Sequence, residues 1–133
     1  MTKIKKRFQE QTERYRENFH KYGYSKMSMF MPSDRRVIRY YELLKNFEFF
    51  QKEEFSAPVT ICDAGCGFGD VNQYLTALGM KKYRYIGLDV VEEFIEEGKK
   101  RYEREGVSYI KRDFITEDLS DLQFDYAISS QTF

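Results

Sequence analysis

Several features that mark other classes of protein are missing from this 133-residue chain. Its 22 basic and 22 acidic residues cancel, so the composition offers no case for a nucleic-acid binder. No apolar run approaches the roughly 18 residues that a membrane-spanning helix needs. The N-terminus is too charged for a secretion signal. These absences predict a cytoplasmic protein that makes no membrane contact and for which nucleic acid is an unlikely partner.

Cysteine and histidine are scarce. The cysteines are Cys62 and Cys66, and the one histidine is His20. Two thiols in a reducing compartment are expected to stay reduced. A metal site usually draws on more histidine and cysteine ligands than this chain offers, so no metal is predicted.

The length corresponds to one domain, with a change of character near residue 57. Charged and aromatic residues alternate through residues 1–56. This segment predicts two helices, the first over residues 3–22. Ser33 or Asp34 is expected to cap the second. The apolar side of that second helix is expected to contain Val37, Tyr40, Tyr41, Leu44 and Phe47.

The most informative segment is residues 61–70, Ile-Cys-Asp-Ala-Gly-Cys-Gly-Phe-Gly-Asp. Residues 59–62 predict a buried strand, and the residues after Asp70 predict a helix. The glycines between them let the backbone turn sharply and approach a ligand, and the helix start presents free N–H groups. This strand, turn and helix predict a site for a nucleotide-like ligand. The inward face of the helix is expected to contain Val71, Tyr74, Leu75 and Leu78.

Three more strands are expected further along, over residues 83–89, 107–114 and 124–130. The first of them ends on Asp89, which is well placed to accept two hydrogen bonds from a ribose diol. A helix over about 91–105 separates it from the next strand, and Gly98 is expected to weaken that helix locally. Residues 115–123 are short and acidic and predict at most one helical turn. Alternating strands and helices predict a parallel sheet with right-handed crossovers.

In this order and spacing, these segments resemble the class I, Rossmann-like S-adenosylmethionine-dependent methyltransferases. The resemblance covers roughly residues 57–133. It implies an α/β fold, a parallel sheet with helices on both faces, truncated to about four strands in the order 3-2-1-4 and preceded by N-terminal helices. It also implies that residues 1–56 form an N-terminal helical lid or extension and that residues 57–133 form an incomplete core that binds S-adenosylmethionine.

The same resemblance implies a role for particular residues. The Asp-x-Gly-x-Gly-x-Gly loop, residues 63–69, would hold the methionine part of the cofactor. Asp89 would hold the ribose hydroxyls. Asp113 would bond the adenine amino group, with Phe114 next to the ring. The full set of predicted cofactor-binding residues is Asp63, Gly65, Cys66, Gly67, Gly69, Asp89, Val90, Asp113, Phe114, Ser129 and Arg39.

Two of these assignments come from the edges of the core. Ser129, with Ser130, would border the methyl-transfer site, because both lie at the end of the fourth strand. Arg39 would bind the cofactor carboxylate from the helix before the core, where Arg35 and Arg36 are equally available. No residue of the chain is a convincing catalytic base, so the catalytic residue is left unknown.

Two other kinds of nucleotide-binding loop fit this sequence less well. A dinucleotide-binding site needs Gly-x-Gly-x-x-Gly, and here the third glycine, Gly69, comes one position early. A phosphate-binding Walker loop is excluded because no Gly-Lys-Ser/Thr follows. The predicted function is a methyltransferase for a small-molecule acceptor, with S-adenosylhomocysteine as a product. The alternative is an inactive cofactor-binding or partner module.

The chain also departs from the family that it resembles. A full enzyme of that kind has seven strands, whereas this sequence stops at Phe133, just past the fourth. The part that binds the methyl acceptor is therefore expected to be largely missing. The fourth strand would be a bare edge, whose unpaired backbone groups predict a homo-oligomer.

Overall fold

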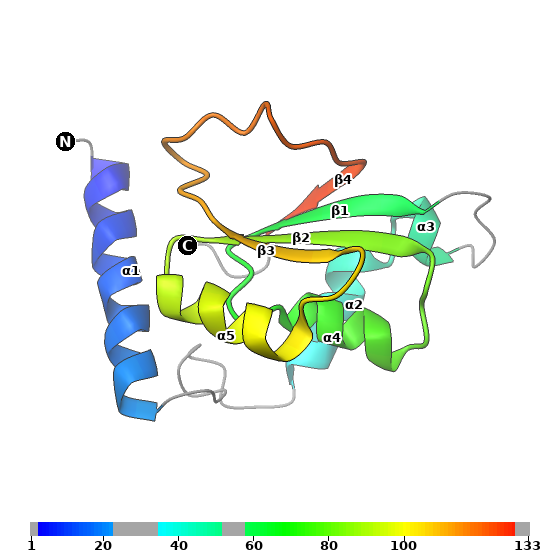
Figure 1. Cartoon of the computed structure of the whole chain (residues 1–133), viewed down its shortest axis with the longest axis horizontal. Coiled ribbons are helices and arrows are strands. Elements are labelled where there is room, and N and C mark those ends of the chain that lie inside the picture. The colour runs from blue at the N-terminus through cyan, green and yellow to red at the C-terminus, as the bar shows by residue number, and fades with distance from the viewer. Residues whose placement is uncertain (1–2, 23–34, 52–57, 130–133) are drawn as a thin grey trace.

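The computed structural model describes residues 3–22, 35–51 and 58–129 (Figure 1). Three helices come first: α1 (Lys3–Tyr22), α2 (Arg35–Leu44) and α3 (Glu48–Gln51). Strands and helices then alternate: β1 (Val59–Ala64), α4 (Asp70–Ala77), β2 (Tyr83–Asp89), α5 (Glu92–Tyr102), β3 (Val107–Lys111) and β4 (Tyr126–Ile128). Within the described ranges, no helix is both long and apolar enough to cross a bilayer.

The strands form one parallel sheet in the order β3-β2-β1-β4. This confirms the predicted α/β fold and its strand order. The crossovers from β1 to β2 and from β2 to β3 step in the same direction, so right-handed connections place α4 and α5 on the same face. Figure 1 shows both helices, with α2, on one side of the sheet.

The other face of the sheet is crossed by the connection from β3 to β4. Figure 1 shows this connection rising on the side away from α4 and α5. The sequence predicts at most one turn of helix in this connection, and the structure has turns and no helix there. The covering helices expected on a second face therefore do not occur among the described residues.

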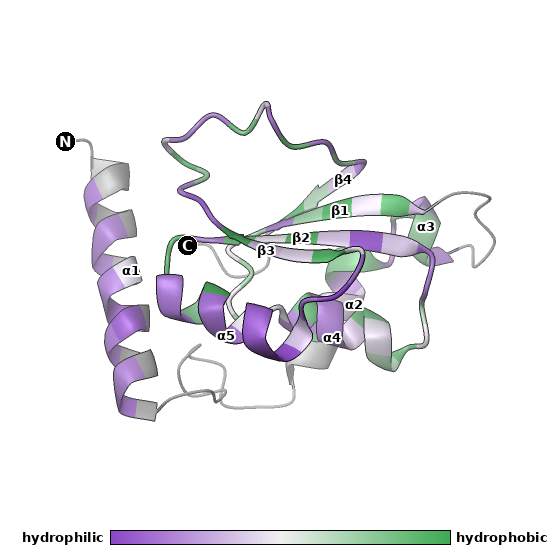
Figure 2. Cartoon of the chain, in the orientation of Figure 1, coloured by the Kyte–Doolittle hydropathy of each residue, from purple (hydrophilic) through white to green (hydrophobic). Residues whose placement is uncertain are grey.

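The main core lies between the sheet and the helices on its covered face. Ile61, Tyr85 and Val107 are register partners on neighbouring strands, so they point the same way. Each is at most 1% exposed. Leu44, Leu75 and Ile95 come from helices and belong to the same buried cluster. Figure 2 shows the complementary pattern, with hydrophilic residues over much of α1 and α5.

Two side chains that were expected to point inward are exposed. Tyr41 is 49% exposed, because its neighbour Tyr40 takes the buried position on α2 at 3%. Leu78 is 52% exposed, because α4 ends at Ala77 and the chain turns away. Phe47 does pack against the core, but it lies beyond the end of α2.

The last two strands are shorter than predicted. β3 ends at Lys111, because the chain then enters a turn that begins at Asp113. β4 begins at Tyr126, just after a double contact between Asp125 and β1. The Asp125 carboxylate accepts a hydrogen bond from the Thr60 N–H at 2.8 Å, and the Asp125 N–H donates to the Thr60 carbonyl.

Some predictions fall on residues outside the described ranges. They include the cap at Ser33 or Asp34 and the position of Ser130. The side chains of Arg35, Arg36 and Val37 also lie outside the description, so these predictions stay predictions.

Candidate functional site

The loop between β1 and α4 has the backbone shape that its glycines predict. Gly65, Gly67 and Gly69 have φ values of 74°, 59° and 85°, in the left-handed region where other residues are strained. The N–H groups of Gly65 and Cys66 both donate to the Leu88 carbonyl, at 2.8 and 2.9 Å. These bonds fold the loop over the carboxyl end of β2.

Asp89 holds this glycine loop from the end of β2. One carboxylate oxygen accepts a hydrogen bond from the Gly67 N–H at 2.9 Å, and the other accepts from the Val91 N–H at 2.9 Å. Asp89 is 8% exposed, and burial raises the pKa of its carboxyl group. Each oxygen keeps capacity for a further hydrogen bond, so the predicted contact with ribose hydroxyls remains open.

Asp63, the acid that precedes the glycines, lies in the core. It is fully buried, and one of its oxygens accepts a hydrogen bond from the Tyr85 hydroxyl at 2.5 Å. The other oxygen has no hydrogen-bond partner among the described residues. Burial raises the pKa of Asp63 to about 7, and the charges of Asp89 and Asp70 add to this effect. The structure therefore places Asp63 under the loop and away from solvent.

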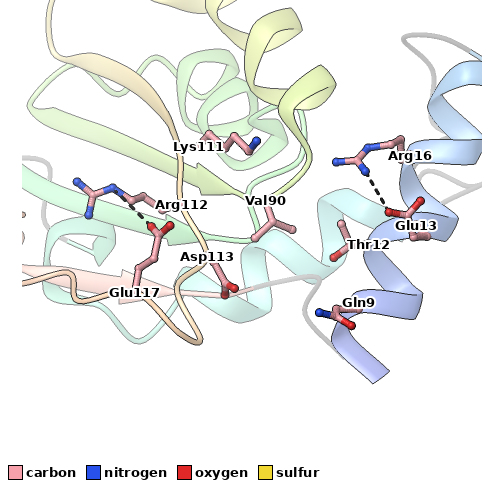
Figure 3. Close-up of a pocket in the computed structure, with 9 residues that line it drawn as sticks. All are labelled: Gln9, Thr12, Glu13, Arg16, Val90, Lys111, Arg112, Asp113 and Glu117. Atoms are coloured by element: carbon pink, nitrogen blue, oxygen red, sulfur yellow. Dashed lines mark hydrogen bonds and ion pairs between the residues drawn. The ribbon is translucent and has the colours of Figure 1, made fainter. Parts of the chain in front are cut away.

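A cavity of about 480 Å³ lies beside the carboxyl ends of β2 and β3. Figure 3 shows α1 on one side of it and the segments that follow the two strands on the other. The lining residues are Gln9, Thr12, Glu13, Arg16, Val90, Lys111, Arg112, Asp113 and Glu117. The cavity thus brings together Val90 and Asp113, two of the predicted cofactor-binding residues.

Asp113 lines the cavity and also shapes the turn after β3. One of its oxygens accepts hydrogen bonds from the N–H groups of Ile115 and Thr116, at 3.1 and 3.3 Å. The other accepts from the Thr116 hydroxyl at 2.6 Å. Such bonds are typical of an aspartate that begins a turn. The adenine contact expected of Asp113 remains a prediction.

α1 is attached beside the cavity through one carboxylate of α5. Arg16 donates to Glu93 at 3.2 Å and to Glu13 of its own helix at 3.0 Å. The His20 imidazole lies 3.6 Å from the same Glu93 oxygen. Glu93 stands in the first turn of α5, so these contacts tie α1 to the helix that follows Val90.

The other predicted residues are spread more widely. Arg39 is exposed on α2 and is not among the residues that line the cavity. Phe114 is half-buried, and Ser129 is exposed just after β4. Cys66 is a buried free thiol, whose pKa burial raises well above its usual value. No group of three or more His, Cys, Asp or Glu side chains in the described part could hold a metal ion.

Sequence reasoning missed the contribution of α1 to the cavity. Its lining residues Gln9, Thr12, Glu13 and Arg16 follow the three- and four-residue spacing of one helix face. That spacing was visible in the sequence as a polar stripe. Aromatic residues are interleaved with this stripe along the same helix, so the sequence alone does not single out the polar face.

Comparison with known proteins agrees with this geometry. Residues 61–133 match the Methyltransferase domain family. The chain belongs to this family. A protein of Mycobacterium tuberculosis (strain ATCC 25618 / H37Rv) named as a methyltransferase, Rv1506c, is 36% identical over 76 residues. That match covers 57% of this chain and 43% of the relative.

Solved methyltransferase structures share the fold at low sequence identity. The plantazolicin methyltransferase BpumL, in complex with a monoazolic desmethylPZN analog and SAH, has a TM-score of 0.54 at 18% identity. It covers 95% of this chain and 49% of its own. Human N-acetylserotonin methyltransferase, in complex with SAM, has a TM-score of 0.55 at 18% identity, covering 77% of this chain and 27% of its own. This methyltransferase domain therefore spans less than half of the relatives described here.

Proposed function

We propose that this chain binds S-adenosylmethionine as part of a methyltransferase that acts on a small molecule. The observation that carries the proposal is the glycine loop, held to the end of β2 by Asp89, whose chain neighbour Val90 lines the cavity; the loop residues and Asp89 are not among the lining residues. The cavity volume of about 480 Å³ is within the range of ordinary ligand sites. The BpumL and N-acetylserotonin methyltransferase complexes support the choice of cofactor.

The residues present fit such a cofactor in two places. Three left-handed glycines have no side chains of their own to hold a ligand away from the loop backbone, which suits close contact with the methionine part. Val90 and Asp113 offer an apolar surface and a carboxylate in the cavity, which suits the adenosine part. When bound, the cofactor supplies an electrophilic methyl group. The chain's own residues align it and exclude water.

We extend the proposal to the division of the chain. Residues 57–133 form the cofactor-binding core, and residues 1–56 form an N-terminal helical lid or extension, in which α1 is the described helix beside the cavity while α2 and α3 pack on the core. The contacts of Arg16 and His20 with Glu93 support this role, because they hold α1 across the cavity from Val90 and Asp113.

The location and assembly of the protein are part of the same proposal. We propose a cytoplasmic protein, with the buried free thiols of Cys62 and Cys66 as support. We also propose self-association through β4. In the described part, β4 pairs with β1 alone, and Ala127 at its centre is exposed.

The function is tested by titrating the full chain with S-adenosylhomocysteine and, in parallel, with NAD. We expect heat release and thermal stabilisation with the first ligand and none with the second. Binding by NAD alone would replace the proposal with a dinucleotide enzyme. A methyl-release assay with candidate acceptors then follows, and binding without turnover would favour an inactive cofactor-binding module.

Asp89→Asn sharpens this titration. The asparagine amide has only one acceptor oxygen, so it cannot accept hydrogen bonds from the Gly67 and Val91 N–H groups through two separate atoms. One of the two bonds that hold the loop is therefore lost. We expect about tenfold weaker binding of S-adenosylhomocysteine, equivalent to about 1.4 kcal/mol. Asp118→Asn is the control, since Asp118 is exposed in the β3–β4 connection and bonds Ser120. Equal affinity of Asp89→Asn and wild type would contradict the proposed site.

A further inference from the structure

Three glycines that lie far apart in the sequence meet at one buried side chain, that of Tyr109. Tyr109 is the central residue of β3, is 1% exposed and belongs to the core cluster on the helix-covered face. Gly87 is its register partner on β2, Gly98 lies in α5, and Gly69 ends the glycine loop. Their distances from its ring show how closely the backbone approaches it.

At Gly98 the ring of Tyr109 fills the space that a side chain would need, and at Gly87 it helps to fill it. A Cβ atom placed on Gly87 would lie 2.9 Å from Cys66 Sγ, 3.0 Å from Cε1 of Tyr85 and 3.1 Å from Cδ1 of Tyr109, so the Tyr109 ring is one of three groups that crowd this position. A Cβ atom on Gly98 would lie 2.9 Å from both Cδ1 and Cε1 of Tyr109, a separation that real Cβ atoms essentially never show. Glycine stabilises a helix less than alanine does, so the stability of α5 by itself does not explain a glycine at position 98. Room for Tyr109 is the physical reason for glycine there.

The far end of the same ring reaches the glycine loop. A Cβ atom on Gly69 would collide with the hydroxyl of Tyr109 and would lie 2.7 Å from Cε1. Gly69 is the N-cap residue that directly precedes α4, and its N–H donates to the Cys66 carbonyl at 2.9 Å. The ring therefore limits how far the loop can move into the core.

Hydrogen bonding does not explain why Tyr109 lies here. Its hydroxyl is buried and has no hydrogen-bond partner among the described residues, which by itself disfavours burial. The ring packs against that of Tyr85, with 5.8 Å between the ring centroids. Packing on the glycines and on Tyr85 is what holds the side chain.

We propose that Tyr109 is a positioning residue for the cofactor site. Its ring is seated on Gly87 and Gly98, supports Gly69, and so holds the glycine loop in the shape that binds the methionine part of the cofactor. The inference rests on the proposed function and adds a residue outside the loop and the acids at the strand ends. Tyr109 acts through Gly69.

The first test compares two substitutions at this position in the full chain, by titration with S-adenosylhomocysteine and by hydrogen exchange of the Gly67 and Gly69 amides. Tyr109→Phe keeps the ring and removes a hydroxyl without a partner, so we expect affinity within threefold of wild type. Tyr109→Leu removes the far end of the ring, so we expect at least tenfold weaker binding and faster exchange at Gly69. Wild-type affinity in Tyr109→Leu overturns the proposal.

A matched control separates positioning from general loss of stability. Phe49 is also 1% exposed, but it packs against Phe47, Phe50 and Tyr126, on the β4 side of the core. Phe49→Leu is expected to lower the melting temperature without changing affinity or Gly69 exchange. Equal losses of affinity in Phe49→Leu and Tyr109→Leu overturn the proposal.

Gly98→Ala tests the same contact from the helix, and carries the test if Tyr109→Leu does not fold. The added methyl favours the helix but displaces the ring toward Gly69, so we expect at least threefold weaker binding. In a Tyr109→Leu background the effect should vanish, because the displaced group is gone. Unchanged affinity and exchange in Gly98→Ala overturn the proposal.

The binding measurement and the hydrogen-exchange measurement test different claims. A wild-type chain that binds no S-adenosylhomocysteine overturns the proposed function. The amide exchange of Gly69 still tests the role of Tyr109, because it needs no ligand. Slow exchange at Gly69 in Tyr109→Leu, equal to wild type, overturns the positioning role even where the ligand binds.

Discussion

At the scale of single residues, the acids of this site divide into two kinds. Asp63 is buried with a single hydrogen-bond donor, the Tyr85 hydroxyl, whereas Asp113 borders the cavity. Burial without a neighbouring cation favours the protonated acid. The pKa of Asp63 is accordingly raised to about 7 from its ordinary value of 3.8. Asp63 is therefore a residue through which pH acts on the stability of the fold.

The sign of this effect follows from linkage. The pKa of Asp63 is higher in the folded state than in the unfolded state. The contribution of Asp63 to the free energy of unfolding is therefore largest below about pH 4, where the carboxyl group is protonated in both states. That contribution is lost as pH rises through about 7. Each pH unit in which only the folded state binds the proton costs about 1.4 kcal/mol of the free energy of unfolding. Asp63→Asn should flatten this decline, as measured by urea denaturation from pH 4 to 8.

A second variant, at the hydrogen-bond partner Tyr85, tests the same titration of Asp63. The hydrogen bond from Tyr85 stabilises the ionised form of Asp63 and so lowers its pKa. Tyr85→Phe removes that donor, so the fall in stability should extend to higher pH. A pH dependence that is identical in wild type and Asp63→Asn would show that another group controls it.

At the scale of elements, the contact between α1 and α5 gives the clearest prediction. The pair of Arg16 and Glu93 is only partly buried, with side chains 34% and 25% exposed. Such pairs contribute about 0.2–1 kcal/mol. Since α1 forms one wall of the cavity, Arg16→Gln and Glu93→Gln should each weaken S-adenosylhomocysteine binding by about twofold to fivefold. A double-mutant cycle measured by calorimetry should show that their effects are not additive.

A salt bridge elsewhere on α5 provides the control for this cycle. Arg101 donates to Glu97 at 2.7 Å, one turn apart on α5, and neither residue is among those that line the cavity. Arg101→Gln should leave ligand affinity unchanged. Full affinity in Arg16→Gln would mean that α1 does not cover the bound ligand.

The elements also show which parts of the structure could be predicted from sequence. The glycine loop and the strand that ends on Asp89 depend on local spacing, so their positions followed directly from the pattern. The exposure of Tyr41 did not, because it depends on which of two adjacent tyrosines packs against the core. The sequence indicates only that Gly98 weakens its helix, whereas the reason for a glycine at this position lies on β3, in the ring of Tyr109. Contacts of that kind join residues that are distant in the sequence, so the hydrophobic periodicity of either segment does not reveal them.

At the scale of the whole molecule, the two sides of the sheet differ. Helices cover one face, while Ala127 and Ser108 are exposed on the other, at the two edge strands. β3 ends on a charged residue, Lys111, which discourages pairing with another chain. β4 contains no charged residue within its bounds. This asymmetry makes β4 the edge at which association is expected.

Ala127→Lys tests association through β4. Size-exclusion chromatography with light scattering should show a concentration-dependent dimer or larger assembly for wild type. The lysine places a charge at the centre of the edge strand, so the variant should shift toward monomer. Ala77→Lys is the matched control, because Ala77 is exposed in the last turn of α4, where a cation is favourable. A wild-type monomer at all concentrations, or equal association of the two variants, would exclude β4 as the contact surface.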